Sequence, residues 1–130
     1  MKWQNTITTA TDTKTAIQEL TKDLQGEHPN VLFLFSSNKE HLPFIQKISA
    51  LFPQAQIIGC TGGGIIGNGE EEKKPAISLT AGFLPDVKIK AFSLSKQQTI
   101  QKHPIDWPKT TEVAPEQQPC FILLLDPFTC

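Results

Sequence analysis

The amino-acid sequence predicts a mixed α/β (α+β) fold, in which one mixed sheet contains a parallel β-α-β unit and an antiparallel hairpin, with helices packed on it. Two observations predict this fold. In the first half of the chain, an amphipathic helical pattern joins two short, continuously apolar runs, as is typical of parallel strands buried on both faces. The next two runs alternate apolar and polar residues, as is typical of a hairpin with one wet face. At 130 residues, the chain has the length of one domain.

The first half holds the predicted parallel unit. A helix is predicted over TTATDTKTAIQELTKDLQG, where Thr11 or Asp12 caps the start and Gly26 ends it. The apolar run NVLFLFSS then predicts a strand over 31–35, LPFIQKISALFP predicts a second helix, and QAQIIGC predicts a strand over 55–59. Because one helix separates the two strands, we expect them to be parallel neighbours with a right-handed crossover.

The second half is predicted to be antiparallel at first and then irregular. AISLTAGF and VKIKAFSL (87–94) are separated by Leu84, Pro85 and Asp86, which predicts a hairpin. Residues 95–119 are polar and Gln-rich and contain four prolines, so we expect a long surface connection there. Phe121–Leu125 predicts another strand buried on both faces. Such a strand needs covering layers that the sequence barely supplies, so we expect residues 1–130 to be the N-terminal part of a longer domain.

Composition narrows the classes of function. The 12 basic residues are all lysine and the net charge is −1, so neither a nucleic-acid nor a membrane partner is expected. The three cysteines, Cys60, Cys120 and Cys130, contain no CxxC pair, so no metal site and no cofactor is expected. The start of the chain has no apolar signal segment, and the longest apolar run is too short to span a bilayer. We therefore expect a cytoplasmic protein.

The glycine-rich stretch GCTGGGIIGNGEEEKK is the most unusual part of the sequence. It contains G-x-G-x-x-G at Gly62, Gly64 and Gly67 directly after a predicted strand. A dinucleotide site also needs a helix that starts at these glycines, whereas here three glutamates and then a strand follow. Gly67-Asn68-Gly69 is typical of a turn, but three successive glycines at a strand end suggest a backbone that something approaches closely.

Polar residues follow the carboxyl ends of the predicted parallel strands, where ligands bind in open α/β sheets. We expect them to form a site for a small polar molecule bearing an amine and a carboxylate, such as an amino acid. In this hypothesis Asp126 contacts the amine and the loop amides contact the acid group. The candidate ligand-binding residues are Ser36, Ser37, Gly59, Cys60, Thr61, Gly62, Gly63, Gly64 and Asp126. The alternative is that these residues only end strands and form turns.

Two other classes of function stay open. Cys60 precedes loop amides that could form an oxyanion hole, and His41 is a candidate base beside it, so a Cys-dependent hydrolase or transferase is one alternative. A free cysteine is more often a small buried apolar residue, so we expect no enzyme and no catalytic residues. The other alternative is a protein-protein interaction module that binds no small ligand.

The order of these segments resembles the N-terminal FIST domain, a sensory domain of signal-transduction and F-box proteins. VLFLFSS, then a helix leading into LFPQAQIIGCTGGGIIGNG, then AISLTAGF and VKIKAFSL, follow the family pattern over residues 3–130. In this resemblance Gly59, Cys60, Thr61 and Gly63 or Gly64 fall on the family's loop, and LLLDPFT on its later Asp-Pro strand. Ile65 stands where relatives often carry an acidic residue.

The resemblance implies a non-catalytic, cytoplasmic module that senses amino acids or similar small molecules. A complete relative continues through the rest of this domain into a second, C-terminal FIST domain. The implied partners are therefore the remainder of the FIST protein and downstream signalling domains.

Overall fold

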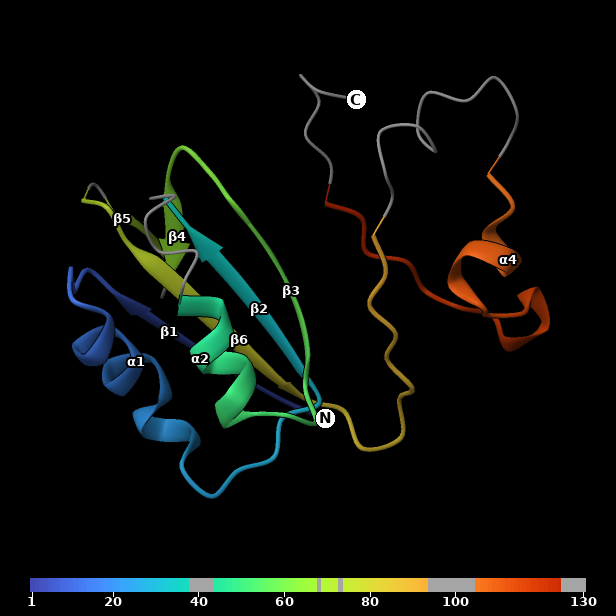
Figure 1. Ribbon diagram of the computed structural model, residues 1–130, viewed down its shortest axis with the longest axis horizontal. Helices are drawn as coiled ribbons and strands as arrows, with labels where there is room; N and C mark the ends of the chain where they lie inside the picture. Colours follow the sequence, from blue (N-terminus) through green and yellow to red (C-terminus); the bar gives the residue numbers. More distant parts are fainter. Residues whose placement is uncertain (38–43, 68, 73, 94–104, 125–130) are drawn as a thin grey trace. The chain divides into compact units, whose positions relative to one another are not determined.

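The computed structural model describes residues 1–37, 44–67, 69–72, 74–93 and 105–124 (Figure 1). The chain forms two compact units, Met1–Ile89 and Lys90–Cys130. Within the described part of the chain, none of the helices has the length and apolar character needed to cross a membrane.

The first unit is built on a four-stranded sheet, and its mixed parallel and antiparallel character is as the sequence predicted. The strands are β1 (Lys2–Thr8), β2 (Val31–Ser36), β3 (Gln56–Thr61) and β6 (Ile77–Phe83), in the order β1-β6-β2-β3. β2 and β3 are parallel and are joined by helix α2 (Phe44–Leu51), so the predicted β-α-β unit is confirmed. β6 runs antiparallel to both of its neighbours, β1 and β2.

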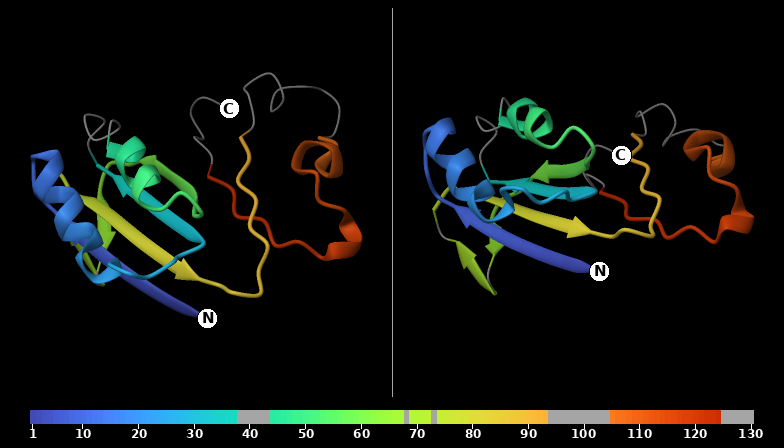
Figure 2. Two further views of the ribbon diagram at one scale, coloured as in Figure 1. Left: turned by 60° about the horizontal axis from the view of Figure 1, so that its bottom comes forward. Right: turned by 90° about the horizontal axis from the view of Figure 1, so that it is seen from below.

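Helices cover one face of this sheet. α1 (Thr13–Thr21), which continues into the 3₁₀ helix η1 (Lys22–Leu24), and α2 both lie on that face (Figure 2). Side chains from the two helices and from alternate positions of β2 and β6 form the core, because successive residues of a strand point to opposite faces. The residues of this core that are at most 1% exposed are Leu20, Leu32, Ile48, Ile77, Leu79 and Ala81.

The start of α1 follows from a side-chain cap. The Asp12 Oδ1 atom accepts a hydrogen bond of 2.9 Å from the Thr15 amide, as expected for a capping residue at this position. The Thr15 amide also lowers the pKa of Asp12, because the hydrogen bond favours the charged carboxylate. After η1, Gly26 adopts a φ of 76°, which glycine allows at little cost, and the helical segment ends.

The predicted hairpin partner of β6 is wrong. The residues after β6 up to Ser93 form no strand, and residue 94 lies outside the described residues. The reason lies in the sheet order: β1 and β2 occupy the two sides of β6, so residues 87–94 have no edge of β6 to join. β1, which the sequence analysis did not predict, pairs with β6 from Lys2↔Phe83 to Thr8↔Ile77.

The glycine-rich stretch instead forms a second, two-stranded sheet. β4 (Ile65–Gly67) and β5 (Glu70–Glu72) are antiparallel, with Gly67 paired to Glu70. Gly69 has a φ of 85° in the connection between them, so this end of the stretch acts as the predicted turn. In the described residues, the glycines are followed by the strands β4 and β5 and not by a helix, which agrees with the sequence argument against a dinucleotide fingerprint.

The second unit contains two short helices and an aromatic cluster. α4 (Trp107–Thr111) and the 3₁₀ helix η3 (Pro115–Gln117) lie within the stretch 95–119 that was expected to be a connection. The rings of Phe92, Trp107 and Phe121 contact one another, with centroid distances of 5.7–6.3 Å. These three rings connect parts of the unit that are distant in sequence.

The predicted buried strand Phe121–Leu125 is also wrong in the described residues. Residues 121–124 form no strand, and their side chains are 40–56% exposed, while Leu125 lies outside the described residues. No described strand pairs with this run, so no ladder of hydrogen bonds in the described sheets holds it extended.

We expect Ile48→Ala to lower the free energy of unfolding by about 2–5 kcal/mol, because it leaves a cavity where α2 meets the sheet. Ile48 is 0% exposed. Ser49→Ala, at the next, exposed position of α2, is the control and should change stability by less than about 0.5 kcal/mol. Urea denaturation of the two variants measures the difference, and equal losses would contradict the packing described here.

Asp12 should make the stability of α1 depend on pH. A carboxyl group with a lowered pKa stabilises the folded state above its unfolded pKa, and this contribution is lost as the pH falls through the folded value. The difference in melting temperature between the wild type and Asp12→Ala should therefore shrink as the pH falls below 3.8, the ordinary value. Asp12→Asn keeps the cap without the charge, so its difference from Asp12→Ala should persist at low pH.

Candidate functional site

The carboxyl ends of β2 and β3 lie side by side. The two strands are parallel and in register, so Ser36 and Thr61 are partners at the last position of the ladder. The structure thus brings together two of the residues that the sequence predicted at one rim. Their convergence follows from the β-α-β connection, which places the ends of both strands at the same edge.

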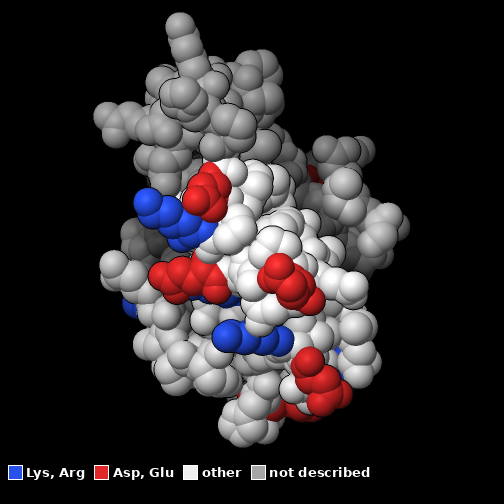
Figure 3. All heavy atoms as spheres, turned by 90° about the vertical axis from the view of Figure 1, so that its right-hand side faces the viewer, with Lys and Arg blue, Asp and Glu red and all other residues white. Residues whose placement is uncertain are grey.

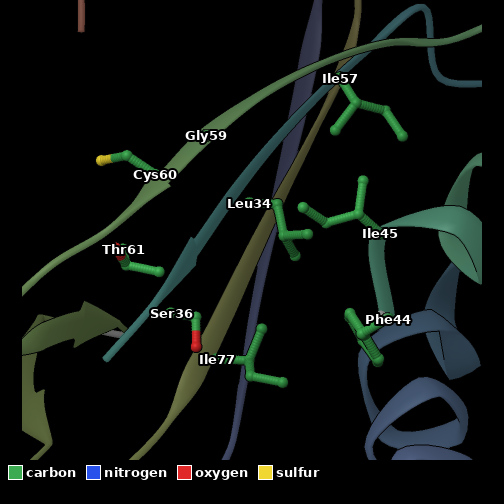
Figure 4. A pocket seen from close by; sticks show the side chains of 9 residues that line it. All are labelled: Leu34, Ser36, Phe44, Ile45, Ile57, Gly59, Cys60, Thr61 and Ile77. Carbon is green, nitrogen blue, oxygen red and sulfur yellow. The ribbon is translucent and has the colours of Figure 1, made fainter. Parts of the chain in front are cut away.

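A cavity of about 210 Å³ opens beside these strand ends, between β2, β3, β6 and α2 (Figure 4). Figure 4 shows Leu34, Ile45, Ile57 and Phe44 pointing toward one another, with Ser36 and Ile77 beside them. The residues that line the cavity are Leu34, Ser36, Phe44, Ile45, Ile57, Gly59, Cys60, Thr61 and Ile77.

Strand alternation decides which side chains reach this cavity. Leu34 is paired with Gly59 and Ser36 with Thr61, so these residues lie on the face of the sheet that α2 covers. Cys60 is the residue between Gly59 and Thr61, so its side chain projects to the opposite face, and Figure 4 shows its sulfur pointing away from Leu34 and the isoleucines. Cys60 therefore contributes backbone to the cavity wall.

Gly59 is required by the contact between β2 and β3. A Cβ atom at Gly59 would lie 1.8 Å from the Leu34 carbonyl oxygen, far inside any van der Waals contact. The glycine thus lets the two strands approach, and it leaves bare backbone in the cavity wall. Glycine at position 59 is therefore explained by strand packing alone, without reference to a ligand.

The next glycines differ from Gly59. The Gly62 amide donates a hydrogen bond of 2.9 Å to the Ser36 carbonyl oxygen, so it already has a partner and ties the loop to the end of β2. A Cβ atom at Gly63 would meet nothing within 4 Å, and one at Gly62 would make an ordinary contact of 3.5 Å with the Gly64 carbonyl oxygen. Neither Gly62 nor Gly63 has a left-handed φ, so the described residues give no steric reason for glycine there.

The other candidate residues are distributed differently. The Ser37 Oγ atom accepts a hydrogen bond of 2.8 Å from the Ala76 amide, which links the end of β2 to the start of β6. Asp126 and His41 lie outside the described residues. Within the described ranges, no three His, Cys, Asp or Glu side chains are grouped as metal ligands would be.

The apolar lining of the cavity was not among the candidate site residues predicted from the sequence. Five residues of the predicted strands and helix supply most of the cavity wall: Leu34, Phe44, Ile45, Ile57 and Ile77. The sequence held one signal, because Phe44 and Ile45 are adjacent at the start of the predicted helix and cannot both face the core. Phe44 is 2% exposed, whereas Ile45 is 38% exposed.

Charges are mixed on the surface shown in Figure 3. The described acidic and basic side chains on that face are interspersed, and the whole chain carries a net charge of −1. One ion pair joins Lys90 and Glu112 of the second unit, and the Lys90 ammonium lowers the pKa of the Glu112 carboxyl by hydrogen bonding and charge attraction. Interspersed charges of both signs give no strong field of one sign on this face.

Comparison with known proteins gives one match. Residues 30–130 match the family model described as the FIST N domain, and this range begins just before β2 and includes all the strands and the helix that form the cavity. No curated protein and no solved structure matches the chain.

Gly59 and Gly63 should respond differently to the same substitution. Gly59→Ala should lower the free energy of unfolding by about 1–3 kcal/mol or more, because the new methyl group collides with the β2 backbone. Gly63→Ala should change it by less than about 0.5 kcal/mol, since the position is open. Thermal and urea denaturation measure both values. A stable Gly59→Ala protein would show that β2 and β3 do not approach as described.

Proposed function

Because the chain belongs to the FIST N domain family, we propose that it is a non-catalytic sensory module that binds a small molecule at the ends of β2 and β3. FIST domains are in general sensory domains of signal-transduction proteins. In this proposal the module acts in the cytoplasm, the ligand is an amino acid or a similar metabolite, and the remainder of the protein or downstream signalling domains receive the signal.

The cavity between β2, β3 and α2 is the observation that carries the proposal. It lies beside the carboxyl ends of two parallel strands, where open α/β sheets bind their ligands. Its volume of about 210 Å³ is below the roughly 300–1,000 Å³ typical of sites for drug-sized molecules. A molecule of the size of an amino acid fits this scale better than a nucleotide does.

Polar groups at one end of the cavity suit a ligand with a polar head. Ser36 and Thr61, which both carry a hydroxyl group, line this end of the cavity, and Gly59 lies between Thr61 and Ile57 in β3. In the proposal the amides of Gly63 and Gly64 contact a carboxylate, and Asp126 contacts an amine. The Gly62 amide is assigned no ligand, because it already binds the Ser36 carbonyl oxygen.

We propose a binding role for this site because Cys60 does not share the face of the cavity. A nucleophile has to reach a substrate bound beside it and a base within hydrogen-bond distance. The Cys60 side chain projects to the opposite face of the sheet from Gly59 and Thr61.

A second candidate function rests on a separate observation. The four side chains of Phe121–Leu124 are each 40–56% exposed, and contiguous exposed apolar residues often mark contacts with other protein segments. This favours an interaction module, whose partner is the rest of the protein or another signalling domain.

Thermal shift measurements on the full chain with the proteinogenic amino acids and related metabolites test the sensory proposal. A ligand that binds only the folded state raises the melting temperature in a concentration-dependent way. At a ligand concentration of 100 times Kd, the free energy of unfolding rises by about 2.7 kcal/mol. Ile45→Trp fills the cavity from its partly exposed rim and should abolish the shift.

Leu51→Trp is the matched control, because Leu51 lies on the same helix, is 53% exposed and does not line this cavity. It should keep the shift. A shift that survives Ile45→Trp would place the ligand elsewhere, and a chain that responds to no compound in the panel would favour the interaction module.

A further inference from the structure

Building on the proposed function, we infer that this cavity selects its ligand by an uncharged aliphatic group, which it buries between α2 and the sheet. The ligand class is then small molecules with a polar head and a short aliphatic tail, such as amino acids with aliphatic side chains. Amino acids with acidic or basic side chains are excluded from the class.

The lining chemistry is the first observation behind this inference. Five of the nine lining residues have aliphatic or aromatic side chains, and none of the nine carries a charged group. A charged ligand tail placed here would lose its hydration without gaining an opposite charge from any lining residue, which is strongly unfavourable. An aliphatic tail loses only contact with water, which is favourable.

The arrangement of the lining gives the ligand one orientation. Ser36 and Thr61 lie together at the strand ends, whereas Ile57 and Ile45 lie toward the other end of the group in Figure 4. An amphipathic molecule suits both ends only with its polar head beside Ser36 and Thr61, at the end where the glycine-rich loop begins, and its tail toward the isoleucines. The head stays close to the glycine-rich loop, as the proposed function requires.

The cavity is lined by buried residues on its inner side and by one partly exposed residue on its solvent side. Leu34, Phe44 and Ile77 are 6%, 2% and 1% exposed, so the packed core holds them in place. Ile45 is 38% exposed and stands at the first turn of α2, where its side chain limits the cavity toward solvent. Ile45 is therefore the residue that sets the longest tail the cavity accepts.

A homologous series of ligands tests the inference. We name glycine, alanine, 2-aminobutyrate, norvaline and norleucine, which share one head group and differ by single methylene groups. Each methylene buried in the cavity should tighten Kd by about fourfold, until the tail exceeds the space available. Isothermal titration calorimetry on the full chain measures Kd for each compound, with glutamate and lysine as charged tails of similar length.

Two variants separate a true size effect from a general change in binding. Ile45→Ala widens the rim, so the compound that binds most tightly should shift to a longer tail. Leu51→Ala removes the same kind of apolar surface from α2 outside this cavity and should leave the order of affinities unchanged.

The outcomes distinguish this inference from the proposed function. Tighter binding with each methylene, together with weak or absent binding of glutamate and lysine, supports the inference. Binding that is lost in Ile45→Trp but favours glutamate, lysine or glycine overturns the inference and leaves the sensory function in place. Absence of binding by every compound, in a chain with a cooperative thermal transition, overturns both.

Discussion

The parallel contact between β2 and β3 is the constraint on which the rest of the first unit depends. It requires the backbones of Leu34 and Gly59 to approach so closely that no side chain fits at position 59. The same contact aligns Ser36 with Thr61, turns Ile57 toward α2 and directs the Cys60 side chain to the other face. Both the polar end and the apolar lining of the cavity are therefore consequences of one ladder of hydrogen bonds.

The sequence was informative where local pattern and tertiary structure agree. Asp12 caps α1, the two apolar runs pair as parallel strands around α2, and Gly69 lies in a turn, because each depends on residues close together in the chain. The family resemblance, which rested on the glycine-rich loop and the strands around it, is also confirmed. The predicted ligand contacts of the loop and of Asp126 stay predictions.

The failed predictions concern sheet neighbours and cover, which local pattern does not encode. VKIKAFSL alternates as a strand does, yet β1, which comes from the opposite end of the first unit, occupies the edge of β6 that it would need. Phe121–Leu124 has the composition of a buried strand, but burial requires layers that these residues cannot supply themselves. The apolar cavity was missed for a related reason, since it forms only where α2 packs on the sheet, which the local pattern does not encode.

The part of the cavity wall that β3 supplies belongs to an edge strand of the described sheet. In the described sheet β3 has a neighbour on one side only, whereas β2 and β6 are held from both sides. Displacing β3 therefore breaks one ladder of hydrogen bonds instead of two, so β3 yields more readily than β2 or β6 to a force applied from within the cavity. A molecule that binds between α2 and β3 would therefore act on an edge strand, and the strand that moves would be one that borders the described sheet.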